Sequence, residues 1–289
     1  MKLVTYAADG ATRVGAVVDG RVVDVYDASV GSQPMLGFLS AGAPAMDAAR
    51  ARLAEVQRHW QPEAHRALEC VTLLAPIPRP GKIIAIGRNY ADHAAETGVK
   101  PFEQPRIIAK LPSSVTGPGS VVHRPEGIAK LDYEIELGVV IGRRTKLMSH
   151  ARALDAVAGY TILNDVSARE FQFDVSPAQT TFAKSMDGFC PMGPWIVTAE
   201  QIPDPQSLAL QLRLNGELLQ DGNTHDMIFD VAHLIEYISR FMTLEPGDVI
   251  ATGTPAGVGA FRAPPRWLQP GDRLRLEIAR IGVLEHSIG

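Results

Sequence analysis

The sequence predicts an α+β fold that is mostly β, with a small N-terminal α/β module and a larger strand-rich domain. Short apolar runs bounded by Gly, Pro, Asn and Asp recur along the 289 residues, as is typical of strands joined by turns. Two segments, 44–60 and 229–241, instead have apolar residues at helical spacing. A proline-rich stretch at 75–81 is the best boundary. We therefore expect domains at residues 1–75 and 76–289.

The composition excludes several classes of protein. Hydrophobic residues make up 46% of the chain, enough for a sizeable core, and the formal net charge is −4 without blocks of like charge. We therefore expect no nucleic-acid or membrane partner. Met1–Val4 is predicted to begin a strand, and we expect no signal peptide there. Cys70 and Cys190 form no CxxC motif, which predicts free buried thiols and a cytoplasmic location.

The first module is predicted to be a strand meander followed by one helix. The expected strands are residues 2–6, 13–18 and 21–25. Asp19-Gly20 between the second and third strands is a strong signal for a two-residue hairpin turn. The segment 44–60 is Ala- and Arg-rich, with an apolar stripe. This module contains no catalytic constellation, and we expect it to serve packing or dimer contact.

A histidine and a glutamate follow the first strand of the second module, residues 82–86. If the next residues are helical, His93 and Glu96 lie on one face, three positions apart. A carboxylate in that position can orient an imidazole that then moves a proton. An ordinary contact on an exposed helix is the alternative, and it is the commoner one for an isolated HxxE.

The most informative stretch is residues 131–142, which alternates polar and apolar residues and then becomes the apolar run LGVVIG. Alternation places every second side chain on one face of a strand. A second apolar run, 157–163, ends in Asn-Asp. The carboxylates concerned are Asp132, Glu134, Glu136 and Asp165. They could belong to a solvated strand face, but carboxylates carried into a core need a cation or a partner. A metal site is therefore predicted as the alternative.

The remaining elements are shorter. Residues 180–183 are expected to be a strand ending in Lys184, which is either a surface lysine or a cation for a substrate carboxylate or oxyanion. Ser167 is a plausible helix N-cap, and Asn215-Gly216 predicts a hairpin. The glycine-rich loop 253–259 departs from the phosphate-binding pattern and favours close approach of backbone to a small ligand.

Six segments occur in the order found in the fumarylacetoacetate hydrolase family. They are GRNYADHAAE, LDYEIELGVVIG, GYTILNDVSARE, FAKSMDGFCPMGPW, RLNGELLQDGNT and PGDVIATGTPAGVG. The chain resembles this family over about residues 80–289, in particular its 2-keto-4-pentenoate hydratase and 2-oxohepta-3-ene-1,7-dioate hydratase-like group. The resemblance implies a mixed β-sheet roll, a homodimer and a bound Mg²⁺, Mn²⁺ or Ca²⁺.

The resemblance also assigns roles to residues of this chain. It implies metal binding by Glu134, Glu136 and Asp165, and catalysis by His93, Glu96 and Lys184. It implies substrate binding by Arg88, Tyr90, Gly253 and Thr254. The residue types agree with the assigned metal site, because three carboxylates without Cys or His select a hard cation such as Mg²⁺ over zinc. We expect no organic cofactor.

Two features depart from the family pattern or indicate a subgroup. Ala183 and Met186 flank the lysine where many relatives have Gly and Phe, which leaves the shape of the pocket open. The stretch 262–268 is similar to that of members acting on diketo sugar acids and of related proteins without a settled activity.

The function predicted from the sequence is hydrolysis of a carbon–carbon bond in a 2-oxo or β-diketo acid. The substrate would be fumarylacetoacetate- or acylpyruvate-like, or a diketo sugar acid, and the reaction would pass through an enolate stabilised by the cation and Lys184. The same groups suit decarboxylation, hydration or isomerisation, and the sequence does not choose among them. A non-catalytic oligomeric module braced by its metal is the alternative from another class.

Overall fold

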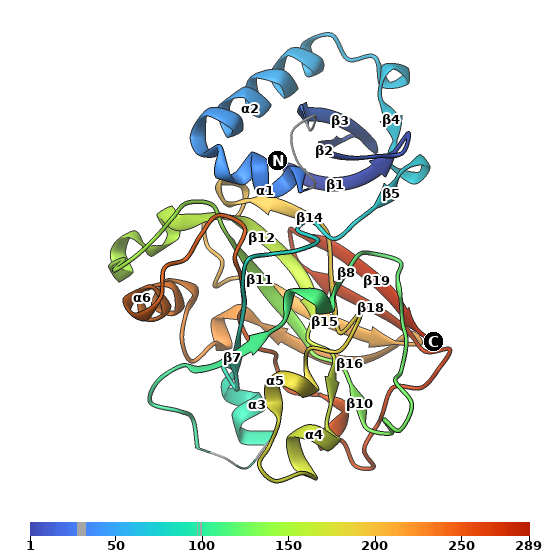
Figure 1. Ribbon diagram of the computed structural model, residues 1–289, viewed down its shortest axis with the longest axis vertical. Helices are drawn as coiled ribbons and strands as arrows, with labels where there is room; N and C mark the ends of the chain where they lie inside the picture. The colour runs from blue at the N-terminus through green and yellow to red at the C-terminus, as the bar shows by residue number, and fades with distance from the viewer. Residues whose placement is uncertain (28–32, 97, 99) are drawn as a thin grey trace.

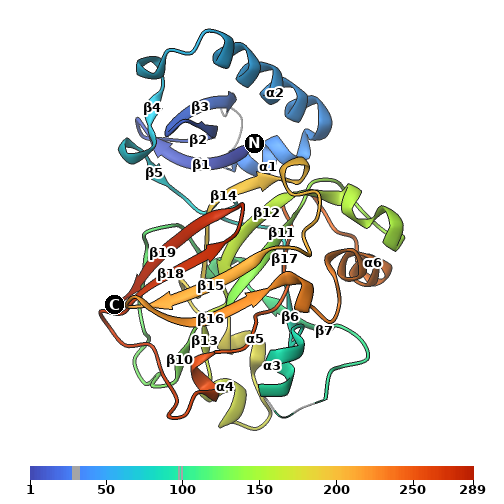
Figure 2. The ribbon, with the colours of Figure 1, turned by 180° about the vertical axis from the view of Figure 1, so that it is seen from behind.

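The computed structural model describes residues 1–27, 33–96, 98 and 100–289 (Figure 1). Strands and sheets dominate, and the helices are few, which confirms the predicted α+β class. The N-terminal part, with two helices beside a small meander, sits at one end of the larger strand-rich body (Figures 1 and 2). No helix in the described part of the chain is long and apolar enough to cross a membrane.

The N-terminal part is built on an antiparallel meander. Its elements are β1 (Lys2–Ala8), β2 (Ala11–Val18), β3 (Arg21–Tyr26), α1 (Pro34–Ser40), α2 (Gly42–Arg58), β4 (Arg66–Ala67) and β5 (Thr72–Leu73). Asp19 in the β2–β3 turn has φ +47°, as the predicted turn requires. Helix α2 confirms the predicted amphipathic segment and buries Ala49, Leu53 and Val56.

One long mixed sheet connects both parts of the molecule. Its order is β4-β3-β2-β1-β14-β12-β11-β17-β6-β7. The strands of the second part are β6 (Ile83–Gly87), β7 (Arg106–Lys110), β11 (Ile135–Ile141), β12 (Val157–Asn164), β14 (Cys190–Thr198) and β17 (Val249–Ala251), with β8 (Val115–Thr116) beside β14. Strand β1 pairs with β14 through Leu3 and Ile196. The N-terminal meander is therefore an extension of the main sheet.

A second sheet packs on the main one and encloses the larger core. Its order is β16-β15-β18-β19-β9. The strands are β15 (Ala209–Leu214), β16 (Glu217–Asn223), β18 (Arg273–Ile278), β19 (Gly282–Ile288) and β9 (Val121–Val122). Ile135, Leu137 and Val139 of β11 share one hydrophobic cluster with Leu212 and Leu276 of this sheet. Because side chains alternate along a strand, Glu136 points away from this core.

The helices of the second part are short except for one. They are α3 (Ala91–Glu96), α4 (Glu170–Phe173), α5 (Thr180–Ala183) and α6 (Val231–Phe241). Short 3₁₀ helices occur at Pro62–Ala64, Leu68–Cys70, Pro112–Ser114, His150–Ala156, Ala199–Gln201, Thr224–Asp226 and Gly259–Phe261. Helix α6 confirms the predicted helix and is capped at its N-terminus by Asp230, whose carboxylate accepts a hydrogen bond from the His233 backbone N–H.

Three local predictions were wrong. Residues 180–183 form α5 instead of a strand, because Ala183 N–H donates to Gln179 C=O and none of the described strands pairs with this segment. Ser167 does not cap a helix, since it belongs to β13 (Ser167–Ala168), which pairs with β10 (Leu131–Asp132). Cys70 is exposed, whereas Cys190 is buried as expected.

Candidate metal centre and active site

The acidic stretch at the centre of the site is interrupted. Strand β10 ends at Asp132, β11 begins at Ile135, and the two residues between them pair with no strand. The Glu134 N–H donates to the Asn164 side-chain carbonyl at 2.9 Å, and the Asp165 N–H donates to the Glu134 C=O at 2.9 Å. These bonds bring Glu134 beside the end of β12, where Asp165 lies.

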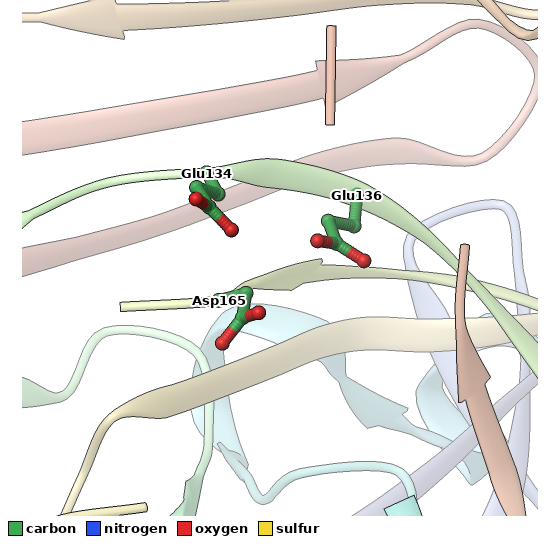
Figure 3. A group of neighbouring side chains, drawn as sticks. All are labelled: Glu134, Glu136 and Asp165. Carbon is green, nitrogen blue, oxygen red and sulfur yellow. The ribbon is translucent and has the colours of Figure 1, made fainter. Parts of the chain in front are cut away.

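The three predicted metal ligands converge on one point. Carboxylate oxygens of Glu134, Glu136 and Asp165 lie within 4.8 Å of one another, and the side chains face one another (Figure 3). All three residues are buried. Asp132, the fourth carboxylate of the stretch, lies outside this group and accepts hydrogen bonds from the Gly259 and Ala260 amides. The interruption of the strand thus separates Asp132 from the face that it was predicted to share.

Glu136 shows that the residues present fit a cation. Its carboxylate accepts a hydrogen bond from the Gly253 N–H at 2.8 Å, and no basic side chain of the described residues lies within 4.0 Å of it. Burial, followed by repulsion from Asp165 and Glu134, raises the pKa of Glu136 well above its ordinary value. Oxygen donors with surplus negative charge are what hard divalent cations require. The triad therefore suits such a cation.

Three buried basic side chains surround the other two carboxylates. Lys184 Nζ donates to Glu134 at 2.8 Å and to Asp165 at 2.6 Å. Lys110 Nζ donates to the second oxygen of Asp165 at 2.6 Å, and Arg169 donates to Glu134 at 2.6 Å. An ionised carboxylate has about four acceptor positions, so these bonds leave room for a cation.

The electrostatics of this cluster favour charged forms. Burial alone would raise the pKa of Glu134, but Lys184 and Arg169 outweigh burial and hold that pKa well below its ordinary value. Burial would likewise lower the pKa of Lys184, and Asp165 and Glu134 instead raise it. Lys184 is therefore an ammonium group next to the triad, which can stabilise negative charge that develops on a bound substrate.

The predicted His–Glu pair forms and is held in place. His93 Nδ1 lies 3.0 Å from Glu96 Oε2. The other oxygen of Glu96 accepts from the Gly257 N–H at 3.0 Å, and Asp92 accepts from the Ala256 N–H at 3.2 Å. Helix α3 is thereby fixed to the glycine-rich loop. If His93 Nδ1 carries the proton donated to Glu96, its Nε2 is free to accept one.

The glycine-rich loop is shaped by contacts with β11. Gly253 has φ +97°, and a Cβ there would lie 2.9 Å from Asn89 Cβ, so glycine is required. The Thr254 hydroxyl donates to the Ile135 C=O and accepts from the Gln220 side chain, both at 2.8 Å. The Gly253 amide and the Thr254 hydroxyl are thus already bonded within the protein, and their role in substrate binding stays a prediction.

One cavity of about 180 Å³ connects these groups. It is lined by His93, Glu134, Glu136, Asp165, Lys184 and Thr254, and Arg88 also contributes. Tyr90 is instead a core residue: its side chain is fully buried, and its hydroxyl has no hydrogen-bond partner among the described residues. The cavity therefore brings together the predicted metal ligands with His93 and Lys184, while Glu96, Gly253 and Tyr90 lie outside its lining.

Sequence reasoning missed four polar residues of the site. These side chains are Lys110, Arg169, Gln172 and Arg106. All of them except Lys110 line the cavity. Lys110 ends an apolar strand, and its nitrogen also donates to the Phe189 C=O at 3.0 Å. A lysine at the end of an apolar strand is the signal that could have indicated a buried cation.

Comparison with known proteins identifies the family. The profile of the fumarylacetoacetate (FAA) hydrolase C-terminal domain matches residues 82–289. This chain belongs to the fumarylacetoacetate hydrolase family. It is 41% identical to a mitochondrial oxaloacetate tautomerase from Xenopus laevis over 271 residues, 93% of this chain and 83% of that protein.

Two solved structures extend the comparison to the whole chain. A fumarylacetoacetate hydrolase from Exiguobacterium antarcticum is 37% identical, with a TM-score of 0.83 and coverage of 100% of this chain and 99% of the other. A maleylpyruvate hydrolase from a Sphingobium species, in complex with manganese(II) and pyruvate, is 29% identical with a TM-score of 0.82, covering 100% and 98%. The family thus contains enzymes that differ in reaction.

Proposed function

We propose that this protein is a Mg²⁺- or Mn²⁺-dependent enzyme that interconverts the keto and enol forms of a short 2-oxo acid. The observation that carries the proposal is His93, held by Glu96, in the lining of the same cavity as the Glu134, Glu136 and Asp165 triad. A cation that only braced the fold would have no use for a proton-transfer pair beside it. The oxaloacetate tautomerase at 41% identity supports this reaction.

The size of the cavity supports a small substrate. Sites for drug-sized ligands measure roughly 300–1,000 Å³, whereas this cavity measures about 180 Å³. A short 2-oxo acid suits that volume better than a long diketo acid.

Three groups of residues would perform three tasks: metal binding, proton transfer and stabilisation of negative charge. Glu134, Glu136 and Asp165 would hold the cation, which supplies Lewis acidity to the 2-oxo carbonyl when bound. His93 Nε2 takes the proton from the carbon next to that carbonyl, and Glu96 stabilises the imidazolium that results. The Lys184 ammonium faces the oxygen that becomes negative. His93 then returns the proton to this oxygen, which completes the enol.

Hydrolysis of a carbon–carbon bond in an acylpyruvate is the second candidate. The same pair could take its proton from water instead of carbon, and water would then attack the distal carbonyl. The maleylpyruvate hydrolase with bound manganese and pyruvate supports this reaction. The difference between the candidates is whether water enters the cavity with the substrate.

A single assay series tests both candidates. Freshly dissolved enol oxaloacetate is followed by its ultraviolet absorbance, and acetylpyruvate and maleylpyruvate are followed for cleavage, each with Mg²⁺, Mn²⁺ or EDTA. We expect metal-dependent ketonisation of oxaloacetate that EDTA abolishes. Cleavage of acylpyruvates without ketonisation would favour the hydrolase instead. Absence of all these activities, with metal bound, would leave the structural-module hypothesis standing.

A further inference from the structure

Two arginines at neighbouring strands of the main sheet line the cavity. Arg88 follows β6 directly, and Arg106 opens β7 opposite Gly87 in the sheet register. Both line the cavity that contains the carboxylate triad. Arg88 has φ +56°, a left-handed conformation that is uncommon for residues other than glycine. Such strained positions cluster at functional sites.

Both side chains pack on the same aromatic ring. The guanidinium carbons of Arg88 and Arg106 lie 5.7 and 5.9 Å from the centroid of Phe102. A ring face attracts cations and restrains their orientation. Phe102 thus restrains both guanidinium groups at the same cavity.

Neither arginine has a carboxylate partner. Within the described part of the chain, no Asp or Glu oxygen lies within 4.0 Å of either guanidinium group. Burial and then the charge of Arg106 lower the pKa of Arg88. By contrast, Lys110, Lys184 and Arg169 deeper in the site all have carboxylate partners. The positive charge of Arg88 and Arg106 is thus available to an anion from outside.

We propose that Arg88 and Arg106 together bind the substrate carboxylate that lies farther from the triad, which makes them the residues that select dicarboxylic over monocarboxylic 2-oxo acids. The proposal rests on the proposed function, in which the 2-oxo acid end lies at the triad. Guanidinium groups match a carboxylate through paired N–H donors. Because triad and arginines share a cavity of about 180 Å³, a few carbons separate the two carboxylates.

The test compares a dicarboxylic with a monocarboxylic ligand. Binding of oxaloacetate and of pyruvate to the Mg²⁺-loaded protein is measured by calorimetry in wild type, Arg88→Met, Arg106→Met and Arg106→Lys. Hydrogen bonds to charged groups are strong enough that each methionine variant should lose about ten- to a hundredfold in oxaloacetate affinity. Pyruvate affinity should stay within about twofold, and Arg106→Lys should lose less than Arg106→Met.

Arg273→Met is the matched control. Arg273 is an exposed arginine on β18 that does not line this cavity, so its removal should change neither affinity. Equal losses for both ligands, or unchanged oxaloacetate binding in both methionine variants, would overturn the second-carboxylate site while the proposed function stands. If wild type binds neither 2-oxo acid in the presence of Mg²⁺, the proposed function fails, and this inference fails with it.

Discussion

Glu134 and Glu136 are neighbours on one face, and their surroundings act on them in opposite directions. Lys184 and Arg169 lower the pKa of Glu134 against the effect of burial, whereas burial and two nearby carboxylates raise the pKa of Glu136. Glu136 is therefore the carboxylate whose charged form is least favourable until a cation binds. Replacing Glu136 by a neutral side chain should have different effects with and without metal.

Glu136→Gln tests this asymmetry. We expect the variant to lose metal affinity because a carboxylate ligand becomes a neutral amide. Without metal it should melt a few degrees higher than wild type, since the amide removes the cost of keeping an ionisable carboxyl buried beside Asp165 and Glu134, and 1 kcal/mol corresponds to roughly 2–4 °C in a protein of about this size. Calorimetric titration with Mn²⁺ and thermal unfolding in EDTA measure both effects. A metal-free variant less stable than wild type would contradict the account.

Glu96→Gln tests the proton-transfer pair. The substitution keeps the shape of the side chain but removes the charge that orients His93 and stabilises its protonated form. Turnover should fall about 10²–10⁴-fold, while Mn²⁺ affinity stays as in wild type because Glu96 is outside the triad. Glu126→Gln, at an exposed position, is the control. Wild-type turnover in Glu96→Gln would exclude the pair from the mechanism.

The carboxylates and the pair were predictable at the level of residues, but their partners were not. Alternation in 131–142 and the spacing of His93 and Glu96 indicate which side chains share a face. The cations Lys110, Arg169 and Arg106 reach the site from other segments. A face pattern within one strand contains no information about which distant strand or helix will lie over it.

At the level of elements, β19 supports the site through β12. Asn164 accepts from the Glu134 N–H through Oδ1, so its Nδ2 faces His286 Nε2 at 2.8 Å. His286 Nε2 must then be the acceptor, and the ring must be neutral. Burial lowers the pKa of His286 to about 4. Protonation would place an N–H against the Asn164 amide donor and disrupt this support.

This arrangement predicts a dependence of stability on pH. The folded-state pKa of about 4 lies below the unfolded value near 6.5, so the unfolded chain gains the proton first as pH falls. The free energy of unfolding should therefore be retained above about pH 6.5 and fall between about 6.5 and 4, by up to roughly 3 kcal/mol. Urea unfolding of wild type and His286→Gln at several pH values measures this, and parallel pH profiles would refute it.

Elements with strong local signals were predictable, and those governed by distant contacts were not. Helices α2 and α6 and the Asn215-Gly216 hairpin follow from periodicity and turn chemistry. The interruption before Ile135 does not, because it is stabilised by Asn164 and Gln220 side chains that accept the Glu134 and Ile135 amides. Helix α5 is likewise too short for periodicity to reveal.

On the scale of the whole molecule, the continuous sheet couples the N-terminal part to the body. Leu3 of β1 is fully buried and pairs with Ile196 of β14. We therefore expect one cooperative unfolding transition in spite of the predicted boundary at 75–81. Leu3→Ala should lower stability by about 2–5 kcal/mol without splitting that transition. Differential scanning calorimetry with circular dichroism measures this, and two separate transitions in wild type would disprove it.

The fold class was predictable from the number of strand signals and from the family segments. The sheet order was not, because β17 inserts between β11 and β6, its partner β6 lies far upstream in the chain, and that pairing is parallel. The homodimer, the cytoplasmic location and the division at residue 75 stay predictions.

The position of β17 has a consequence for biosynthesis. Strand β11 has β17 as one of its two neighbours, and Glu136 receives its amide partner from Gly253. A nascent chain therefore exposes its acidic segment on the ribosome long before the residues that complete the site are translated. Domains fold as units during synthesis. A site completed by the Gly253 amide therefore cannot form until nearly the whole polypeptide has emerged from the exit tunnel.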